Sequence, residues 1–343
     1  MEIDKYFKEA IKKEASDLHL IGGEPPSLRF EGELKNIDEK QIDGKSLETA
    51  IMSALNKEQQ EAYQETKDLD FAYVIDGVRF RVNLHQQSGQ IGLAARLIPE
   101  EIPSPKDLHF EESLMEIPKL LDGLVLVVGP TGCGKSTTIA SLVEEINKER
   151  RSHIITIEDP VEFLFKDKKS LIEQREVGTD TKSFDSALKH VLRQDPDVIF
   201  IGEMRDPETI ATALTAAETG HLVFSTLHTN SAAEAVERIV DVFEGAKQKQ
   251  ILIQLAAVLR VVVAQQLVPA KDGGRVPARE ILINNSAVAN LIRENHIGQI
   301  KSTIQTGAKE GMVTMENSLK NLVKEGWITK DVLESRTGKM RKV

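Results

Sequence analysis

The residues whose type and spacing most clearly suggest chemistry form one short glycine-rich stretch. Gly129-Pro-Thr-Gly-Cys-Gly-Lys-Ser136 has glycine, glycine, lysine and serine at the places required by an eight-residue phosphate-binding pattern. The apolar segment Leu124–Val128 precedes this stretch, and a helix-forming segment follows it. Glycine lets the backbone turn its amides toward a ligand, and a helix N-terminus adds a positive dipole. The stretch therefore predicts a site for nucleotide phosphates.

The side chains of this stretch have separate expected parts in binding ATP and Mg²⁺. Lys135 should reach the β- and γ-phosphates, and the Ser136 hydroxyl should ligate Mg²⁺. Cys133 should act through its backbone amide rather than through its thiol. The residues expected to bind nucleotide here are Gly129, Pro130, Thr131, Gly132, Cys133, Gly134, Lys135, Ser136 and Thr137.

Two further apolar segments, Ile154–Ile157 and Val198–Ile201, end in carboxylates. Nucleotides bind where parallel strands end, so these acids are predicted to face the phosphates. We assign Glu203 to orienting or polarising the attacking water, with contact to Mg²⁺ through water as a second role. Glu162 is the alternative base, and Glu158 and Asp159 are expected to shape the metal shell.

Two histidines flank a third apolar segment, Leu222–Thr226. We expect a nucleotide-linked role for both His221 and His228. Because they lie at opposite ends of one short strand, only one of them can approach the phosphates directly.

The chain has 343 residues, enough for about two domains, and its pattern of apolar and polar residues changes near residue 100. Before that point, apolar and polar residues alternate on both sides of Asp76-Gly77, which predicts a β-hairpin. The expected elements of this small α+β domain are helices at Ile3–Ala15 and Ser46–Tyr63 and strands at Leu69–Val74, Val78–Leu84 and Ile91–Ile98.

The proline-rich stretch Pro99–Pro105 predicts a stiff linker. We place the domains at 1–98 and 113–343, with the linker at 99–112.

Beyond the linker, apolar strands alternate with helices, which predicts an α/β domain built on a mainly parallel sheet. The expected helices between the strands are Thr137–Asn147, Ser183–Arg193 and Pro207–Glu218. From Ser231 onward we expect mostly helix, clearest at Ala232–Val242 and Lys247–Gln266. The apolar stretch Ile251–Val268 contains Gln and Arg residues, so we interpret it as a buried helix and expect no insertion into the membrane.

Composition argues against several classes of protein. The net charge of −10 disfavours broad binding to nucleic acid through phosphate neutralisation. The single cysteine, Cys133, can form neither an internal disulfide nor a four-cysteine zinc site. No signal peptide is visible at the start of the sequence. We therefore expect a cytoplasmic setting.

Four motifs together resemble those of the type II/type IV secretion ATPases. Gly129–Thr137 looks like the Walker A motif and Ile157–Glu162 like the Asp-box. Gly202–Asp206 looks like the Walker B motif, and Thr219-Gly-His together with Leu227-His-Thr looks like the His-box. Ser16–Leu20 and Arg79–Asn83 extend the resemblance into the N-terminal region. It implies a homohexamer whose subunits join a PAS-like N-terminal domain to a RecA-like ATPase domain. It also implies that Arg81 and Arg96 contact the nucleotide phosphates, with Arg205 and Arg238 as weaker candidates for contacts between subunits.

Within this superfamily the chain is most similar to the ATPases of pilus retraction and twitching motility. Assembly and secretion ATPases usually carry a tetracysteine module, which one cysteine cannot supply. Ala287-Val-Ala-Asn-Leu-Ile-Arg-Glu294 resembles the retraction signature, although Ala289 stands where the signature has arginine. The resemblance assigns coupling to Asn290, Leu291, Ile292, Arg293 and Glu294. It implies a motor at the inner face of the cytoplasmic membrane that acts on a platform protein and, indirectly, on pilin.

Three alternatives remain open from the sequence. The first is a pilus-assembly or type II secretion ATPase of the same superfamily. The second is a nucleotide-binding regulator with negligible turnover, against which the acidic clusters argue. The third is a RecA-type nucleic-acid motor, which conflicts with the negative charge.

Overall fold

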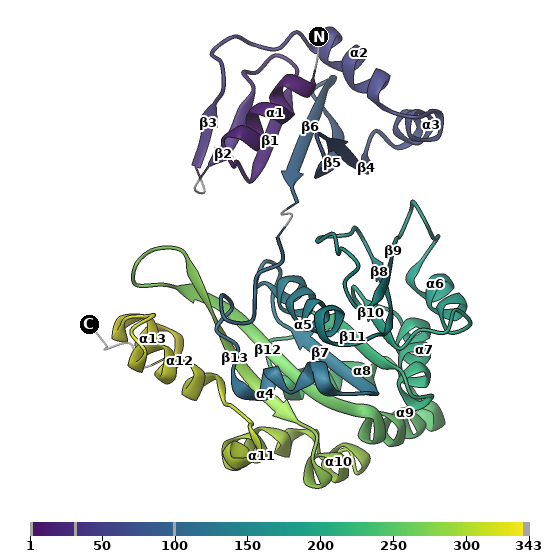
Figure 1. Ribbon diagram of the computed structural model, residues 1–343, viewed down its shortest axis with the longest axis vertical. Helices are drawn as coiled ribbons and strands as arrows, with labels where there is room; N and C mark the ends of the chain where they lie inside the picture. Colours follow the sequence, from purple (N-terminus) through teal and green to yellow (C-terminus); the bar gives the residue numbers. More distant parts are fainter. Residues whose placement is uncertain (1–2, 31–32, 99–100, 339–343) are drawn as a thin grey trace. The chain divides into compact units, whose positions relative to one another are not determined.

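The computed structural model describes residues 3–30, 33–98 and 101–338, and it divides the chain into two compact units (Figure 1). The first unit is Met1–Glu101 and the second is Ile102–Val343. Pro99 and Glu100 of the expected linker lie outside the described residues. The part of that linker from Ile102 onward belongs to the second unit.

The first unit is built on a six-stranded antiparallel sheet with the order β3-β2-β1-β6-β5-β4. Its strands are β1 Asp17–Ile21, β2 Ser27–Phe30, β3 Glu33–Asn36, β4 Leu69–Ile75, β5 Val78–Gln87 and β6 Gln90–Leu97. Its helices are α1 Asp4–Lys12, α2 Gly44–Ala54 and α3 Lys57–Thr66. The predicted hairpin at Asp76-Gly77 is confirmed, because both residues have positive φ and β4 pairs with β5.

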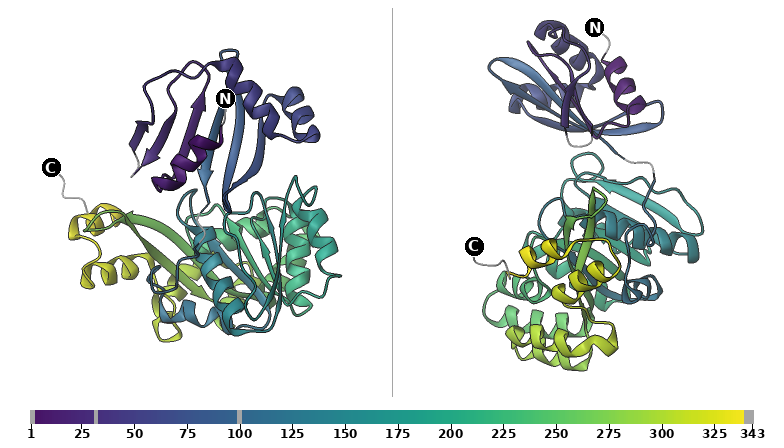
Figure 2. Two further views of the ribbon diagram at one scale, coloured as in Figure 1. Left: turned by 45° about the horizontal axis from the view of Figure 1, so that its top comes forward. Right: turned by 90° about the vertical axis from the view of Figure 1, so that its left-hand side faces the viewer.

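One face of this sheet carries the core of the first unit. On β5, Phe80, Val82 and Leu84 are fully buried and share a cluster with Phe7 of α1 and Leu47 of α2. The alternate positions on β5 are polar and face the other way, as the two-residue period of a strand requires. Figure 2 shows α1 lying across the sheet. The opposite face is therefore left as a polar surface.

The second unit is built on a seven-stranded sheet with the order β13-β12-β7-β11-β10-β8-β9. Neighbouring strands are parallel except at β13, which is antiparallel to β12. The strands are β7 Gly123–Val128, β8 His153–Glu158, β9 Leu171–Glu176, β10 Val198–Ile201, β11 Leu222–Leu227, β12 Leu259–Pro269 and β13 Arg275–Ile283. The expected parallel α/β architecture is confirmed.

Helices cover both faces of this sheet. The α-helices are α4 Glu112–Met115, α5 Lys135–Glu149, α6 Phe184–Val191, α7 Pro207–Glu218, α8 Ala232–Asp241, α9 Gly245–Val258, α10 Ser286–Arg293, α11 Ile300–Thr306, α12 Met315–Lys324 and α13 Lys330–Arg336. Short 3-10 helices lie at Ile117–Lys119, Ile297–Gln299 and Gly307–Glu310. The six residues of β7 are all buried because Val125 and Val127 pack toward α5, whereas Leu124, Leu126 and Val128 pack toward α6–α11.

The prediction of one helix over Lys247–Gln266 was wrong in its second half. Helix α9 ends at Val258, and the chain continues directly as β12 from Leu259. The run Val261–Ala264 is buried on both faces of the sheet, so it lacks the alternation that marks a half-exposed strand. The expectation of mostly helix after Ser231 therefore missed both β12 and β13.

The segment Ser46–Tyr63 also differs from its prediction, because it forms two helices, α2 and α3. Asn56 starts the second one: its side chain accepts a hydrogen bond from the Gln59 backbone, and the Gln59 side chain accepts one from the Asn56 backbone. This capping box is a strong helix-start signal that divides the segment.

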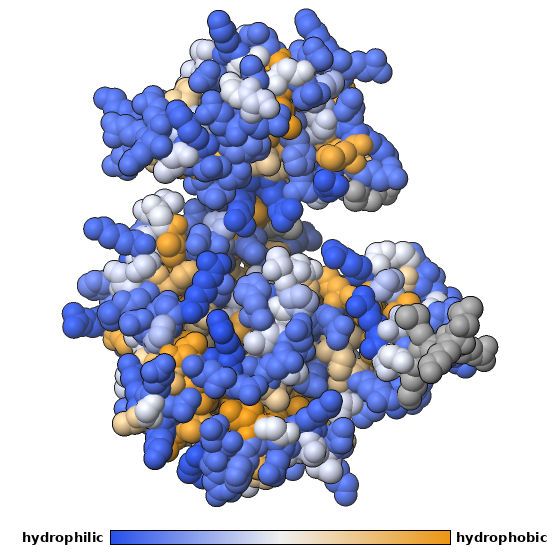
Figure 3. Space-filling model, turned by 180° about the vertical axis from the view of Figure 1, so that it is seen from behind, coloured by the Kyte–Doolittle hydropathy of each residue, from blue (hydrophilic) through white to orange (hydrophobic). Residues whose placement is uncertain are grey.

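Among the described residues, no helix is both long and apolar enough to cross a bilayer. In the view of Figure 3, apolar surface gathers on the second unit, whereas the first unit presents mostly polar residues. Large apolar side chains exposed on the second unit include Leu121, Leu171 and Ile253.

Candidate nucleotide site

The glycine-rich stretch connects the end of β7 to the start of α5. Gly132 and Gly134 have φ values of +75° and +85°, which L side chains rarely adopt. Gly134 is the N-cap of α5, which begins at Lys135, so the first amides of that helix open onto the loop. The loop thus has the local backbone geometry of an anion site.

Gly129 packs the loop against the neighbouring strand β12. An added Cβ would lie 2.3 Å from the Gln265 carbonyl oxygen and 2.6 Å from the Cys133 sulfur. The Gly129 amide donates to the Leu227 carbonyl of β11 at 3.3 Å. The start of the loop is therefore held between two strands with no space for a side chain.

Lys135 is buried, and its ammonium group bonds to the loop itself. Nζ donates to the carbonyls of Gly129 at 2.9 Å and Pro130 at 3.2 Å. A phosphate would offer the same ammonium a charged partner in place of two carbonyls. Cys133 is also buried, and burial raises the pKa of its thiol, so the side chain stays neutral and unreactive.

Glu203 lies at the same edge of the sheet as the loop. The register aligns Leu227 with Val128 and Ile201 with Ser225, so β7 and β11 end together and β10 ends two residues earlier at the same edge. Glu203 follows β10 and is in contact with two cationic or titratable groups: Arg205 NH2 at 2.5 Å and His228 Nε2 at 3.5 Å. The geometry brings Glu203 and His228 to the edge where the loop begins.

Glu158 ends β8 at this edge and is almost completely buried. It accepts hydrogen bonds from Thr156 Oγ1 at 2.6 Å, Gln174 Nε2 at 3.3 Å and the Glu162 backbone at 3.3 Å. Burial outweighs these bonds and raises its pKa to about 7. These contacts anchor the loop that holds Asp159 and Glu162, whose side chains are exposed.

His221 and the C-terminal coupling residues lie at the opposite edge of the sheet. The His221 carbonyl accepts from Gly123 at the start of β7, and its ring nitrogen Nδ1 lies 2.9 Å from the Ala216 carbonyl. Six strand residues separate it from His228, about 20 Å along the strand. The structure therefore brings His228, and not His221, to the loop of the same chain.

Helix α10 follows β13 at this same opposite edge, because Ile283 pairs with Val261 near the start of β12. Val288 and Ile292 anchor the helix in the core, while Asn290, Arg293 and Glu294 are exposed and Leu291 is partly buried. Of the expected coupling residues, Asn290, Arg293 and Glu294 thus lie on the surface, remote from the phosphate loop, whereas Ile292 is buried in the core.

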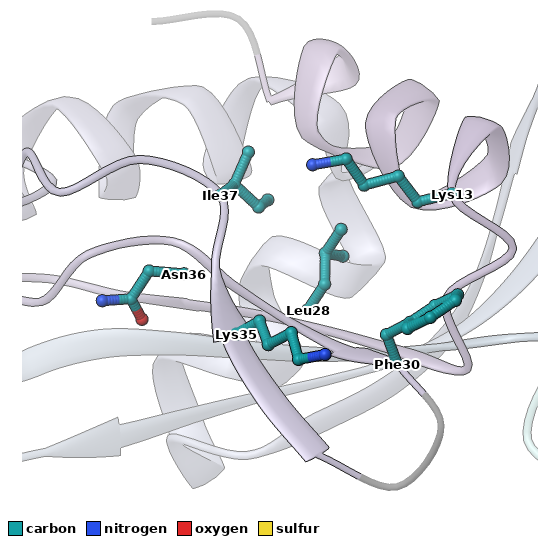
Figure 4. Close-up of a pocket in the computed structure, with 6 residues that line it drawn as sticks. All are labelled: Lys13, Leu28, Phe30, Lys35, Asn36 and Ile37. Carbon is teal, nitrogen blue, oxygen red and sulfur yellow. The ribbon is translucent and has the colours of Figure 1, made fainter.

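Arg81 and Arg96 are cross-strand neighbours on the polar face of the first unit. Both are exposed, and Arg96 Nε donates to Asp17 at 2.9 Å. The same unit has a pocket of about 410 Å³. Its lining residues, from α1, β2 and β3 and their flanks, are Lys13, Leu28, Phe30, Lys35, Asn36 and Ile37 (Figure 4). It contains none of the residues predicted to bind nucleotide.

Sequence reasoning missed two residues next to the loop: Gln265, which contacts it, and Arg279, which contacts Gln265. Gln265 donates to the Cys133 carbonyl, and Arg279 donates to Gln265. The available signal for Gln265 was a set of polar residues within the apolar run Ile251–Val268, which we interpreted as a buried helix; Arg279 lies beyond that run.

Comparison with known proteins identifies the family. Residues 1–325 match the family described as type II/IV secretion system protein. The chain belongs to this family. It is 44% identical over 332 residues to a Pseudomonas aeruginosa protein named type IV pilus retractation ATPase PilT, covering 96% of both chains. It is 46% identical over 313 residues to a Neisseria gonorrhoeae twitching motility protein, covering 91% of this chain and 84% of that one.

A solved structure titled as the pilus retraction motor PilT with bound ADP matches with a TM-score of 0.91 and 46% identity. The match covers 98% of this chain and 96% of that one. The expected fold class, a RecA-like P-loop domain with a smaller α+β N-terminal domain, is confirmed by this similarity.

The buried carboxyl of Glu158 predicts a pH-dependent contribution to stability. The folded chain holds this proton up to about pH 7, whereas the unfolded chain releases it near pH 4.5. The folded state therefore binds more protons between these values, so this group makes the free energy of unfolding fall as the pH rises from below 4.5 to above 7, by about 3 kcal/mol in total. Glu158→Gln should remove this component, as measured by urea unfolding followed through Trp327 fluorescence.

The exposed Glu149→Gln serves as the matched control and should keep the wild-type pH dependence. An unchanged pH dependence in Glu158→Gln would contradict the raised pKa of the Glu158 carboxyl.

Proposed function

We propose that this chain is a hexameric ATPase motor that powers retraction of a type IV pilus. The observation that carries the proposal is the phosphate loop at Gly129–Ser136, with Lys135, Glu203 and His228 at one edge of the sheet. The chain is similar along almost its whole length to a pilus retraction motor with bound ADP, which supports the same nucleotide and the same task.

The loop binds the phosphates of ATP. Backbone amides between Thr131 and Thr137, which include the N-terminus of α5, surround the anion. Lys135 exchanges its contacts with the Gly129 and Pro130 carbonyls for the β- and γ-phosphates. Because the ammonium is buried, its attraction to phosphate is weakly screened.

Mg²⁺ fits this site as a partner of the phosphates. No cluster of three or more His, Cys, Asp or Glu able to hold a metal occurs within residues 3–30, 33–98 and 101–338. Mg²⁺ usually takes few protein ligands and completes its shell with phosphate oxygens and water. Ser136 would ligate it and Glu203 would contact it through water; when bound, it offsets the charge of the phosphates.

Glu203 orients the water that attacks the γ-phosphate. Its carboxylate is mostly buried and accepts from Arg205, and His228 is close enough to fix its second oxygen. Glu162 is the rival base, carried on a loop that Glu158 holds through the Glu162 backbone amide. Arg81 and Arg96 complete the site by binding the phosphates, since the arginine fork pairs well with phosphate oxygens.

Six copies of the chain form a ring in the cytoplasm, at the inner face of the membrane. Exposed apolar side chains on the second unit support contacts between copies. Asn290–Glu294 and His221, at the edge opposite the phosphate loop, transmit the nucleotide state to neighbouring subunits and to a membrane platform protein. Through that partner the motor removes pilin subunits from the base of the pilus.

Removing the ammonium or the base should stop ATP turnover. Lys135→Ala is expected to give no measurable steady-state hydrolysis, because the phosphates lose their buried cation. Glu203→Gln should lower kcat by about 10²–10⁴ while the nucleotide still binds. The surface variant Lys119→Ala, which removes only an exposed pair with Glu116, should hydrolyse ATP normally. Wild-type turnover in Lys135→Ala would refute the site.

Deletion of the gene separates retraction from assembly. A retraction motor predicts excess surface pili and no twitching, restored by the wild-type gene but not by the Lys135→Ala allele. Loss of surface pili on deletion would instead support the pilus-assembly alternative.

A further inference from the structure

The phosphate loop is tied to strand β12 by one buried amide side chain. Gln265 Nε2 donates to the Cys133 carbonyl at 2.7 Å, and Gln265 Oε1 accepts from Thr138 Oγ1 at 2.9 Å. Gln265 and Thr138 are only 4% and 1% exposed. One side chain therefore holds both the middle of the loop and the first turn of α5, and water cannot replace it.

The same Gln265 oxygen accepts a second hydrogen bond, from Arg279. Arg279 pairs with Gln265 across β12 and β13, and its Nε donates to Oε1 at 2.8 Å. Arg279 is 0% exposed, the largest fully buried side chain among the described residues. A buried cation requires partners of matching geometry, so its remaining contacts are informative.

Those remaining contacts all lead to one short segment, Leu108–Glu111. The guanidinium donates to the Leu108 carbonyl at 2.8 Å, the His109 carbonyl at 3.1 Å and the Glu111 carboxylate at 3.1 Å. It also lies over the Phe110 ring, 5.0 Å from its centre. Every residue of the segment therefore contacts Arg279.

This segment lies early in the second unit, shortly after the boundary at Glu101 and Ile102. A movement of Leu108–Glu111 would therefore displace the chain that connects this segment to the first unit. The segment is itself compact, since the Leu108, His109 and Phe110 amides bond to the Ser104, Lys106 and Pro105 carbonyls.

We propose that Gln265 and Arg279 are positioning residues that transmit the nucleotide state of the phosphate loop to Leu108–Glu111. The proposal rests on the proposed function, because it requires nucleotide at the loop. When phosphate draws Lys135 away from the Gly129 and Pro130 carbonyls, the loop shifts. Gly129 packs so closely against Gln265 that the loop cannot move without moving Gln265. The displacement then passes through the planar, rigid guanidinium of Arg279 to Leu108–Glu111.

Hydrogen exchange of the full-length chain, with and without ADP, tests this relay. In the wild type, ADP should slow exchange at Gly129–Thr137 and also change exchange at Leu108–Phe110. Gln265→Met has a similar volume but cannot hydrogen-bond in this way, so it should keep the response at the loop and lose the response at Leu108–Phe110. Gln266→Met, the partly exposed neighbour on β12, is the matched control and should behave as wild type.

Kinetics provide the second readout. Gln265→Met should lower kcat about tenfold, as expected for a lost buried hydrogen-bond network, with KM for ATP changed by less than about threefold. If Gln265→Met does not fold, Arg279→Lys replaces it, because lysine keeps the charge but cannot reach all of the partners at once; it should give the same pattern.

Two outcomes would overturn the relay: no ADP response at Leu108–Phe110 in the wild type, or a full response in a folded Gln265→Met or Arg279→Lys. Absence of ADP protection at Gly129–Thr137 in the wild type would instead refute the proposed function itself, and the relay with it.

Discussion

The phosphate loop keeps its shape because Gly129 packs directly against strand β12, with no side chain between the two backbones. An added Cβ would lie 2.3 Å from the Gln265 carbonyl, well inside van der Waals contact. The remaining features of the site depend on this approach. It lets Lys135 fold back over the loop, lets Gln265 reach the Cys133 carbonyl, and aligns the start of α5 with the loop.

The parallel sheet separates two kinds of residue. At the carboxyl edge lie the loop, Glu203 and His228, which are the groups suited to phosphate chemistry. At the opposite edge lie His221 and helix α10, whose exposed residues suit contact with other molecules. A rigid sheet between these edges is a reasonable basis for a motor, since chemistry at one edge need not interfere with contacts at the other.

Short local motifs could be predicted from the sequence better than the strands that pack around them. The phosphate loop, the acidic strand ends and the β4–β5 hairpin follow local rules: glycine spacing, buried runs that end in carboxylates, and a turn at Asp76-Gly77. Strand β12 does not, because an apolar run buried on both sides looks alike as a helix or a strand. Mistaking it for a helix hid Gln265, and with it the pairing of β12 and β13 that brings Arg279 to Gln265.

The contacts between residues far apart in the sequence could not be predicted, because they depend on how the strands pair. Gln265 and Arg279 meet only because β12 and β13 form a hairpin, and Arg279 reaches Leu108 across 171 positions of sequence. The two predicted histidines show the converse. From the local sequence, His221 and His228 were equally good candidates for a nucleotide-linked role. Only the parallel register of β7 and β11 places His228 near the loop and His221 at the opposite edge of the sheet.

The central claim is that the close approach of Gly129 to β12 creates the nucleotide site. Calorimetric titration of ADP with Mg²⁺ into the full-length chain tests it most directly. We expect one site per chain in the wild type and in Gly298→Ala, where an added Cβ meets nothing within 4 Å. In Gly129→Ala we expect affinity to fall by at least about tenfold, because overpacking at this contact distorts the loop. Unchanged ADP affinity in a folded Gly129→Ala would contradict the claim.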